Sequence, residues 1–424
     1  MAGCSGWYGA APDKPLPGKR ISILSLEDSL KPDPKFSKVE VRLPRPFKNL
    51  SWRQAGGKPD HVMGHISASG ELRTLWKVSI GKGSSSDAQL ITAPVVYRGL
   101  IYTMDTESNI RAIHTETGKT HWLVNVASKE EEKKSTGGGL AIANGKLFVS
   151  TGFGEVIALN LQKGELLWRR SLNGPIRAPP TYFKGRIFAV TIDNILHALS
   201  ETNGKTLWTH MGIVETAGLL GGAAPAAAGN IIISAFSSGE EFAFRHENGR
   251  VIWSDTLTAF RQYSPLSKLA HIKGRPAIDA NNVIVTSNSG RTISINLRTG
   301  ERIWEQRVGS GNSPWVAGEF VYLLSSFGGL LCLEKRTGRV VWVSQLPKYK
   351  DMKNQENPVF WSGPLLAGDR LLVGSSKKDI WSVSPYTGKI LGGIKLSAPV
   401  FIAPIAADNI VYILSDDAQL IALR

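Results

Sequence analysis

Short apolar segments, each closed by a turn that contains glycine, recur along most of this 424-residue chain. In each repeat, a small residue and an apolar residue precede a turn that ends in glycine, and a tryptophan follows that glycine by four positions. Six full copies end in Trp122, Trp168, Trp208, Trp253, Trp304 and Trp342. A seventh copy, with Thr387-Gly388, has Gly392 where the tryptophan is expected.

The spacing of these copies predicts the fold. Successive tryptophans are separated by 38 residues (Trp304 to Trp342) to 51 residues (Trp253 to Trp304), which is the length of one four-stranded blade of a β-propeller. The segments beside each turn are rich in Ile, Val and Leu, and the glycine supplies the positive φ that a tight hairpin needs. We expect each tryptophan to begin an outer strand and to bury roughly 150–250 Å² against the neighbouring blade.

A second series of positions marks the beginning of the innermost strands. A small residue is followed by proline and a short apolar segment at Ala93-Pro94, Ala178-Pro179, Ala224-Pro225, Ser313-Pro314, Gly363-Pro364 and Ala403-Pro404. Gly139-Leu140 and Pro276-Ala277 occupy the two remaining places, which gives eight blades. Small residues fit the crowded axis of a propeller, and proline is tolerated because one edge of an innermost strand faces the central channel.

The two ends of the chain complete one blade together. The sequence stops at Ala422-Leu423-Arg424, part-way through an eighth copy, and the missing strand is available at about residues 71–80. Pairing these segments would close the ring and remove an open sheet edge. We therefore predict an all-β protein, an eight-bladed β-propeller of four-stranded antiparallel blades over residues 61–424. Residues 1–60 are expected to be an extended basic linker with a lipid-attachment site.

The net charge of +15 would suit nucleic acid, an anionic membrane surface or an acidic protein partner. Lys and Arg are spread along the whole chain without a recognisable nucleic-acid-binding motif, so we expect no nucleic-acid partner. No uncharged apolar run reaches the ~18 residues of a membrane-spanning helix. Cys4 and Cys332 give neither a disulfide framework nor metal-ligand spacing. Cys332 occupies the small-residue position of its repeat, where we expect it to be buried.

The first residues resemble a lipid-attachment motif. Ala2-Gly3-Cys4 is similar to the lipobox at which bacterial lipoproteins are cleaved and lipidated on cysteine, although the charged and apolar regions of a signal peptide are missing. The resemblance implies lipidation of Cys4, and Ser5 in place of aspartate implies transport to the outer membrane. A basic linker would reinforce a single lipid anchor.

The glycine–tryptophan repeat is also similar to that of pyrroloquinoline-quinone (PQQ) dehydrogenases. Those enzymes carry adjacent cysteines over the cofactor and a carboxylate beside calcium, whereas this chain has no adjacent cysteines and places acidic residues such as Asp193 at turns. His61 and His65 have metal-like spacing but no evident third ligand. We expect no catalytic residue, no metal and no cofactor. We interpret His121 as a packed position, because other copies have Leu or Ile there.

Three connections between an outer strand and the next inner strand are long, at 127–138, 256–275 and 345–362. The repeat places all three on one face, and long connections often form the binding face of a repeat protein. Residues 260–269 mix aromatic, aliphatic and basic side chains, a composition that favours a protein interface. The alternative, that these apolar groups pack on their own blade, stays open.

The eight repeats, the ring closure, the missing catalytic groups and the Ala-Gly-Cys start together resemble the BamB family, lipoprotein propellers of the outer-membrane β-barrel assembly machinery. The resemblance covers about residues 49–424. It implies a non-catalytic, lipid-anchored scaffold on the periplasmic face of the outer membrane, a monomer within a complex. Such a scaffold binds the periplasmic domains of the pore-forming subunit and aids insertion of outer-membrane proteins. A PQQ-dependent enzyme, or another propeller that binds protein or glycan, is the alternative.

In that family, the partner-binding loops precede the inner strands of two adjacent blades, one containing Leu and Arg and the other rich in Asp. The matching regions here are 213–222, which has the leucines but no arginine, and 258–275, which has no carboxylate. The partner surface would then be more acidic, or the contacts apolar. The expected partner-binding residues are Leu219, Leu220, Arg261, Tyr263, Leu266, Lys268, Leu269 and His271.

Overall fold

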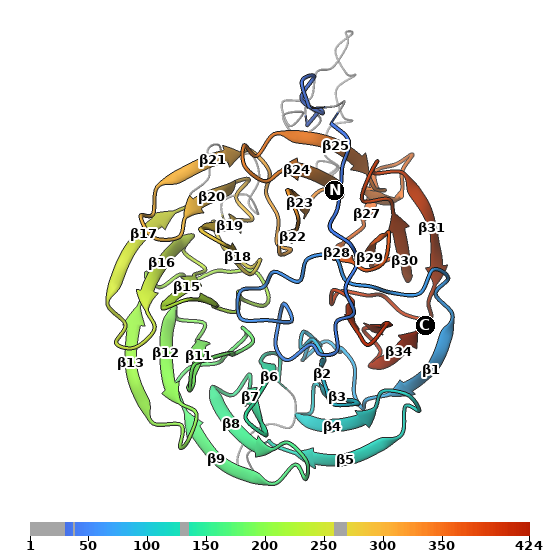
Figure 1. Ribbon diagram of the computed structural model, residues 1–424. Helices are drawn as coiled ribbons and strands as arrows, with labels where there is room; N and C mark the ends of the chain where they lie inside the picture. The colour runs from blue at the N-terminus through green and yellow to red at the C-terminus, as the bar shows by residue number, and fades with distance from the viewer. Residues whose placement is uncertain (1–29, 37–38, 128–134, 258–268) are drawn as a thin grey trace, which may run out of the picture. The chain divides into compact units, whose positions relative to one another are not determined.

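Eight four-stranded antiparallel sheets stand around a common axis, which confirms the predicted propeller (Figure 1). The computed structural model describes residues 30–36, 39–127, 135–257 and 269–424, and residues 31–424 form one compact unit. Within the described ranges there is no helix, and so none that could cross a membrane. Cys4 lies outside these ranges, and the boundary at residue 60 stays a prediction.

Blades 1 to 7 take their strands in chain order from the axis outward, and blade 8 combines both ends of the chain. Blade 1 contains β2 (Val95–Tyr97), β3 (Leu100–Met104), β4 (Asn109–His114) and β5 (Thr120–Asn125), and blade 2 contains β6 (Gly139–Ala143), β7 (Lys146–Ser150), β8 (Glu155–Asn160) and β9 (Leu166–Ser171). Blade 3 contains β10 (Thr181–Phe183), β11 (Arg186–Val190), β12 (Ile195–Ser200) and β13 (Thr206–Met211), and blade 4 contains β14 (Ala226–Ala228), β15 (Ile231–Ala235), β16 (Glu240–Arg245) and β17 (Val251–Thr256). Blade 5 contains β18 (Ala277–Asp279), β19 (Asn282–Thr286), β20 (Thr292–Asn296) and β21 (Arg302–Gln306), and blade 6 contains β22 (Trp315–Ala317), β23 (Phe320–Leu324), β24 (Gly329–Glu334) and β25 (Val340–Gln345). Blade 7 contains β28 (Trp361–Leu366), β29 (Leu371–Ser375), β30 (Asp379–Val383) and β31 (Ile390–Lys395), and blade 8 contains β32 (Ile405–Ala407), β33 (Ile410–Leu414), β34 (Gln419–Leu423) and β1 (Thr74–Ser79). A hairpin of β26 (Tyr349–Asp351) and β27 (Glu356–Pro358) lies between blades 6 and 7 in the chain.

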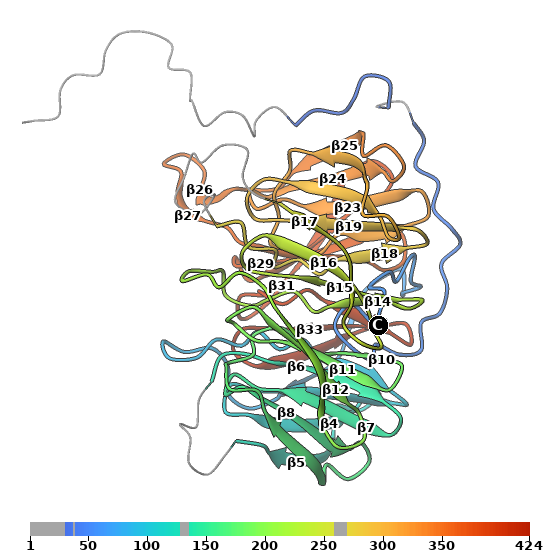
Figure 2. The ribbon, with the colours of Figure 1, turned by 90° about the vertical axis from the view of Figure 1, so that its left-hand side faces the viewer.

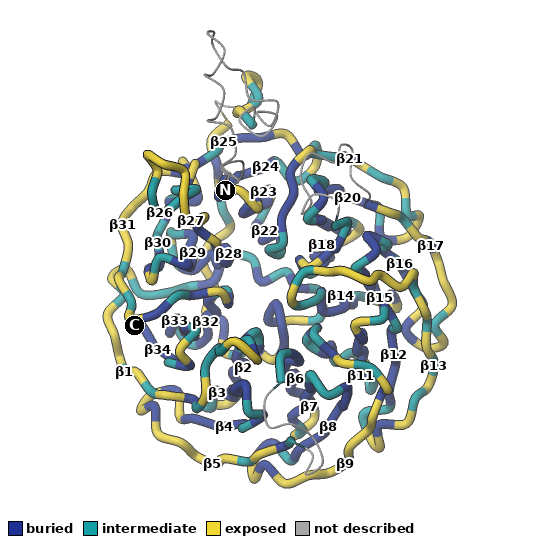
Figure 3. The backbone as a smooth tube through the Cα atoms, turned by 180° about the vertical axis from the view of Figure 1, so that it is seen from behind, coloured by how far each residue is buried: buried dark blue, intermediate teal, exposed yellow. Residues whose placement is uncertain are grey.

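Side-chain burial follows from the place of each strand in its blade (Figure 3). Neighbouring blades cover both faces of the middle strands, so all five residues of β33 are apolar and buried. The outer strands have one covered and one open face, and burial alternates along β13. The expectation for His121 was therefore wrong: its position faces outward, and His121 is exposed, as are Leu167 and Leu207 in other copies.

Tryptophan joins each of seven blades to the next, as the repeat predicted. Trp253 of β17 is 8% exposed, and its Nε1 donates a hydrogen bond of 2.8 Å to the carbonyl of Leu297 in blade 5. Its ring lies against Gly300, whose φ is +76° and where a Cβ would come within 2.7 Å of Trp253. Glycine is required at that turn for both reasons. The equivalent indole-to-carbonyl bond is made by Trp76, Trp122, Trp168, Trp208, Trp304 and Trp342.

Ring closure explains why blade 7 lacks this tryptophan. Each indole packs on the turn between the third and fourth strands of the next blade, but in blade 8 these strands are β34 and β1, which no turn connects. An indole at Gly392 would have no such turn to contact, and no heavy atom lies within 4 Å of the position that a Cβ would take there. β1 pairs with β34 from Thr74↔Leu423 to Ser79↔Gln419, which confirms the predicted closure.

Residues 49–66, here called the belt, run around the axis on the face where the innermost strands end (Figure 1). The belt contacts all eight blades, in blade order. Backbone hydrogen bonds join Trp52 to Val96, Arg53 to Ile142, Pro59 to Ala227, Asp60 to Ile278, Ile66 to Gly368 and Asn49 to Asp408. Side chains add Gln54 to Tyr182 and Trp315 to Gly64. The belt thus gives hydrogen-bond partners to strand edges that would otherwise face the channel.

Two belt histidines have structural contacts. The ring nitrogens of His65, which is 2% exposed, lie 2.8 Å from the carbonyl oxygens of Pro44 and Gly368. Nδ1 of His61 lies 2.7 Å from the carbonyl oxygen of Pro276 in blade 5. Both side chains therefore anchor the belt to its surroundings rather than facing each other across a metal site.

Candidate partner-binding face

The connections from the outer strand of one blade to the inner strand of the next lie on one face of the ring, here called the loop face, and the belt lies on the other (Figure 2). The hairpin β26–β27 stands out from the loop face (Figure 2). The described parts of the three long connections are all on this side, as the repeat predicted. Any partner of the loop face would approach the propeller opposite the belt.

The connection between blades 3 and 4 presents apolar side chains to solvent. Met211, at the end of β13, is 66% exposed, and Ile213 and Val214 are 60% and 59% exposed. Leu220, further along the same connection, is 37% exposed. Exposed apolar side chains so close together in one connection are typical of a protein-binding surface rather than of a loop that packs on its own blade.

Polar side chains from two blades hold the backbone of this exposed segment. Asn194 of blade 3 donates from Nδ2 to the carbonyl of Ile213 at 2.5 Å, and its Oδ1 accepts a bond from the backbone N–H of Ser237. On the other side, Oε2 of Glu240 accepts a bond of 2.7 Å from the N–H of Ile213. The backbone of Ile213 is thus fixed from both directions, while its side chain points to solvent.

The two regions predicted to bind a partner lie next to each other. The backbone N–H of Leu219 donates a hydrogen bond of 2.8 Å to Nδ1 of His271, which precedes blade 5. Burial, followed by the positive charge of Lys273, lowers the pKa of His271 to about 4, so that the ring is neutral and Nδ1 accepts. His271 is 5% exposed and positions Leu219; it offers little surface of its own.

The structure places four of the eight predicted residues. Leu220 is exposed, Leu219 and Leu269 are half-buried, and His271 is buried. Arg261, Tyr263, Leu266 and Lys268 lie outside the described residues. The sequence interpretation included Ile213 and Val214 in the matching region 213–222 without naming them as contact residues, and it missed Met211. The sequence signal for these residues is an Ile-Val pair just after the outer strand. The outer strand is the last strand of its blade, so this apolar pair cannot belong to a further buried strand of that blade.

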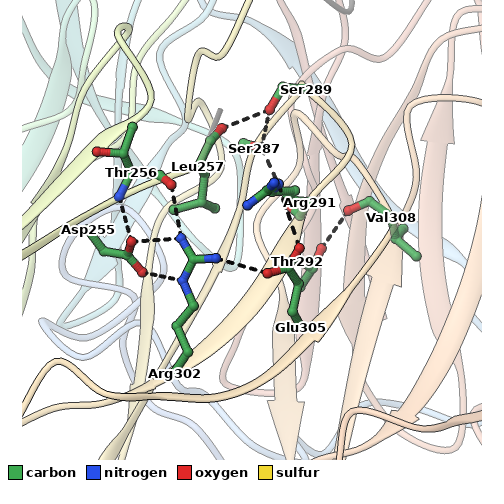
Figure 4. A network of polar contacts seen from close by, with 10 residues as sticks. All are labelled: Asp255, Thr256, Leu257, Ser287, Ser289, Arg291, Thr292, Arg302, Glu305 and Val308. Carbon is green, nitrogen blue, oxygen red and sulfur yellow. Dashed lines mark hydrogen bonds and ion pairs between the residues drawn. The ribbon is translucent and has the colours of Figure 1, made fainter. Parts of the chain in front are cut away.

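A polar network fixes the chain just before residue 258, at the base of the predicted binding loop (Figure 4). The guanidinium of Arg302 in blade 5 makes two bonds of 2.7 Å to the carboxylate of Asp255 in blade 4, and it also donates to the carbonyl of Thr256. Glu305 accepts a bond from the same guanidinium at 2.9 Å. The hydroxyl of Ser289 donates to the carbonyl of Leu257 at 2.9 Å. Blades 4 and 5 are joined rigidly where this connection leaves β17.

A small hollow lies beneath the connection between blades 3 and 4. Its lining includes Arg177, Asn194, Phe236, Ser237 and His271. Among the described residues, no group of three or more His, Cys, Asp or Glu side chains could hold a metal ion. Cys332 is free and buried, as its place in the repeat predicted.

Comparison with known proteins identifies relatives over most of the chain. The family model described as outer membrane protein assembly factor BamB matches residues 106–344 and 350–424. The uncharacterized protein RP232 of Rickettsia prowazekii is 28% identical over 280 residues, which are 65% of this chain and 67% of that protein. The outer membrane protein assembly factor BamB of Shewanella oneidensis is 24% identical over 347 residues, which are 80% of this chain and 85% of that protein.

Solved structures confirm the architecture. BamB from Moraxella catarrhalis matches with a TM-score of 0.70 at 17% identity, covering 84% of this chain and 100% of that chain. Quinohemoprotein alcohol dehydrogenase from Comamonas testosteroni matches with a TM-score of 0.67 at 12% identity, covering 92% of this chain and 82% of the enzyme. At such identities these likenesses show the fold alone, and one fold can serve both an assembly factor and an enzyme. The family model distinguishes them, because it matches more than half of the chain: the protein belongs to the family of the outer membrane protein assembly factor BamB.

Proposed function

We propose that this protein is a non-catalytic scaffold of the outer-membrane protein assembly machinery, and that its loop face binds the periplasmic domains of the pore-forming subunit. The family assignment and the assembly role named for the relatives support this function. Lipidation of Cys4 and a position on the periplasmic face of the outer membrane belong to the same proposal. They are supported by the similarity of Ala2-Gly3-Cys4 to a lipobox.

The observation that carries the binding site is the exposed aliphatic segment at Ile213 and Val214. Ile213 and Val214 are 60% and 59% exposed, so their complete burial by a partner would stabilise the complex by roughly 1–2 kcal/mol for each. Asn194 and Glu240 already hold the backbone of Ile213, so little conformational freedom is lost on binding. Adjacent Leu219 and Leu220 and the half-buried Leu269 extend the surface toward blade 5.

Catalysis of the quinoprotein kind is the competing proposal. Adjacent cysteines over a quinone cannot be formed by Cys4 and Cys332, and Cys332 is buried in β24. The described residues supply no cluster of metal ligands that would hold calcium beside a cofactor. Mixing the purified protein with PQQ and calcium separates the two proposals, since stoichiometric binding, seen as a change in cofactor absorbance, would favour the enzyme.

The binding site is tested by charge substitution on the loop face. Ile213→Asp with Val214→Asp, and separately Leu219→Asp with Leu269→Asp, are introduced into the tagged full-length protein in the organism that makes it. We expect both pairs to abolish recovery of the pore-forming subunit in mild detergent while thermal unfolding of the propeller stays unchanged.

The matched control is Leu166→Asp with Leu167→Asp on the outer rim of blade 2. These leucines are 57% and 47% exposed, so the substitution adds the same charge to an equally open apolar pair away from the loop face. Normal recovery with the rim variant and loss with the loop-face variants would support the site. Unchanged recovery with all three would place the interface elsewhere on the propeller.

A further inference from the structure

Strand register places a small residue just before the start of the innermost strand in six blades, whereas blade 3 has Pro179 there and blade 5 has a charged residue. In strand register, Ala277↔Ile284 of blade 5 matches Ala226↔Ile233 of blade 4. Arg275-Pro276 is therefore equivalent to Ala224-Pro225. The sequence pattern predicts Pro276-Ala277 in this position, so the correct alignment lies one residue earlier. Arg275 stands where other blades have Ala93, Ala224, Ser313 and Ala403. A guanidinium thus replaces the small side chain that six of the other blades have at this position.

Two further cations lie at the next level toward the loop face. Lys273 and Arg177 each stand three residues before the equivalent prolines, Pro276 and Pro180, so they hold the same position in blades 5 and 3. The stem of Lys273 passes between two glycines of neighbouring blades. A Cβ on Gly221 would lie 3.1 Å from Cε of Lys273, and a Cβ on Gly311 would lie 3.8 Å from its Cδ.

Within the described part of the chain, no ion-pair partner faces these cations. Nε of Arg177 and Nε of Arg275 are buried without a hydrogen-bond partner. Burial alone lowers the pKa of Arg275 to about 10 and lowers that of Lys273, with no carboxylate to offset it. Water still reaches the side chain of Lys273, which is exposed although protein surrounds it on most sides. Lys273 therefore keeps access to solvent without a counter-charge among the described residues.

Two neighbouring histidines are each influenced by one of these cations. Burial and then Lys273 lower the pKa of His271 near the mouth, and burial and then Arg275 lower the pKa of His61, in the belt, to about 3. Both rings are neutral at ordinary pH and do not add to the charge. The positive charge at this site therefore comes from the lysine and arginine side chains and not from these histidines.

We propose that the loop-face mouth of the central channel is a carboxylate-binding site, in which Arg275 and Lys273 hold the carboxylate and Arg177, two blades away in blade 3, adds a third positive charge. Guanidinium and ammonium groups form charge-assisted bonds with carboxylates. The carboxylate has two sources: an acidic side chain of a docked protein, or a small polycarboxylate from solution. The site itself does not depend on the assembly role.

The experiment uses the purified full-length protein and two probes, citrate and a glutamate-rich peptide, with binding followed by calorimetry. The test variant is Lys273→Gln with Arg275→Gln. The control is Lys205→Gln with Arg250→Gln, which removes the same charge from exposed turn residues on the belt side. We expect saturable binding of at least one probe that the channel variant weakens by at least about 10-fold and that the control retains.

Each outcome decides between the sources or against the site. Binding of citrate as well as peptide identifies a site for small carboxylates, whereas binding of the peptide alone identifies one for an acidic side chain of a partner. No binding of either probe to the wild-type protein, or an equal loss in the control, overturns the proposal in favour of diffuse surface charge. Either result leaves the test of the loop-face aliphatic segment unaffected.

A second variant distinguishes a role of Arg275 in binding from a purely structural role. Arg275→Ala restores the small residue that other blades have, and it removes an unpaired cation from a confined position. We expect it to raise the melting temperature of the free protein and to weaken probe binding. A marked fall in melting temperature would show that Arg275 supports the fold instead, and would overturn the proposed site.

Discussion

Replacement of Trp253 by alanine tests how the blades are held together. An indole hides roughly 150–250 Å², and at about 25 cal/mol per Å² its burial contributes ~4–6 kcal/mol. The bond from Nε1 to the Leu297 carbonyl adds about 1 kcal/mol. Partial collapse of the surroundings and a compact unfolded state reduce these sums, so we expect Trp253→Ala to cost about 3–5 kcal/mol of unfolding free energy.

The assay is urea denaturation followed by far-ultraviolet circular dichroism, because fluorescence would change with the loss of the tryptophan itself. Trp253→Phe keeps most of the apolar contact and removes the hydrogen bond, so we expect it to cost ~1–2 kcal/mol. The control is Ile303→Ala on the open face of β21, where the side chain is 43% exposed and the cost should be within about 0.5 kcal/mol. A loss below about 1 kcal/mol for Trp253→Ala, or an equal loss for the control, would refute the role assigned to the inter-blade indole.

Two further predictions concern ring closure and a buried carboxyl. Deletion of residues 410–424 removes β33 and β34 and leaves β1 and β32 without partners, so we expect an aggregating chain; a soluble truncation that melts cooperatively would contradict this. Glu241 is fully buried, neither carboxylate oxygen has a partner among the described residues, and burial raises its pKa well above 4.5. The folded state therefore holds the proton more tightly than the unfolded chain, and stability is lost as the pH rises above that value. Glu241→Gln should raise the melting temperature at mildly alkaline pH and much less near pH 4.5; an equal shift at both pH values would show that ionisation of Glu241 is not the cause.

The architecture could be predicted from the sequence because most blades contain the residues that form the contact with the next blade. A glycine and a tryptophan at fixed spacing specify a turn and the indole that packs on the turn of the next blade, and the incomplete last copy specifies closure. The same packing explains why Gly392 stands in place of a tryptophan. Blade 8 has no turn between β34 and β1 on which an indole from blade 7 could pack.

The belt could not be predicted in the same way. Its contacts with the blades are mainly backbone hydrogen bonds, for example from Trp52 to Val96, and such bonds leave no pattern of side-chain types in the sequence. The shift at Arg275 has a similar origin. Pro276-Ala277 contains the same residue types as the small-residue–proline pairs, and only the pairing of Ala277 with Ile284 shows which residue starts the strand.

The candidate site was predicted in outline and missed in detail. Adjacent blades place their connections side by side, so the proximity of Leu219 and His271 follows from the order of the repeats. The exposure of Ile213 and Val214 does not, because in a sequence of mostly buried strands an aliphatic pair is first assigned to the core. Their exposure depends on Asn194 and Glu240, which come from two blades and fix the backbone in three dimensions.

The most direct test of the account is affinity purification of the full-length protein from the membranes of the organism that makes it, in mild detergent, with mass spectrometry of what accompanies it. We predict recovery of the pore-forming subunit of the outer-membrane assembly machinery in near-stoichiometric amount. Its absence from an otherwise intact, folded propeller would contradict the proposed scaffold role and leave the family relationship as one of shared architecture.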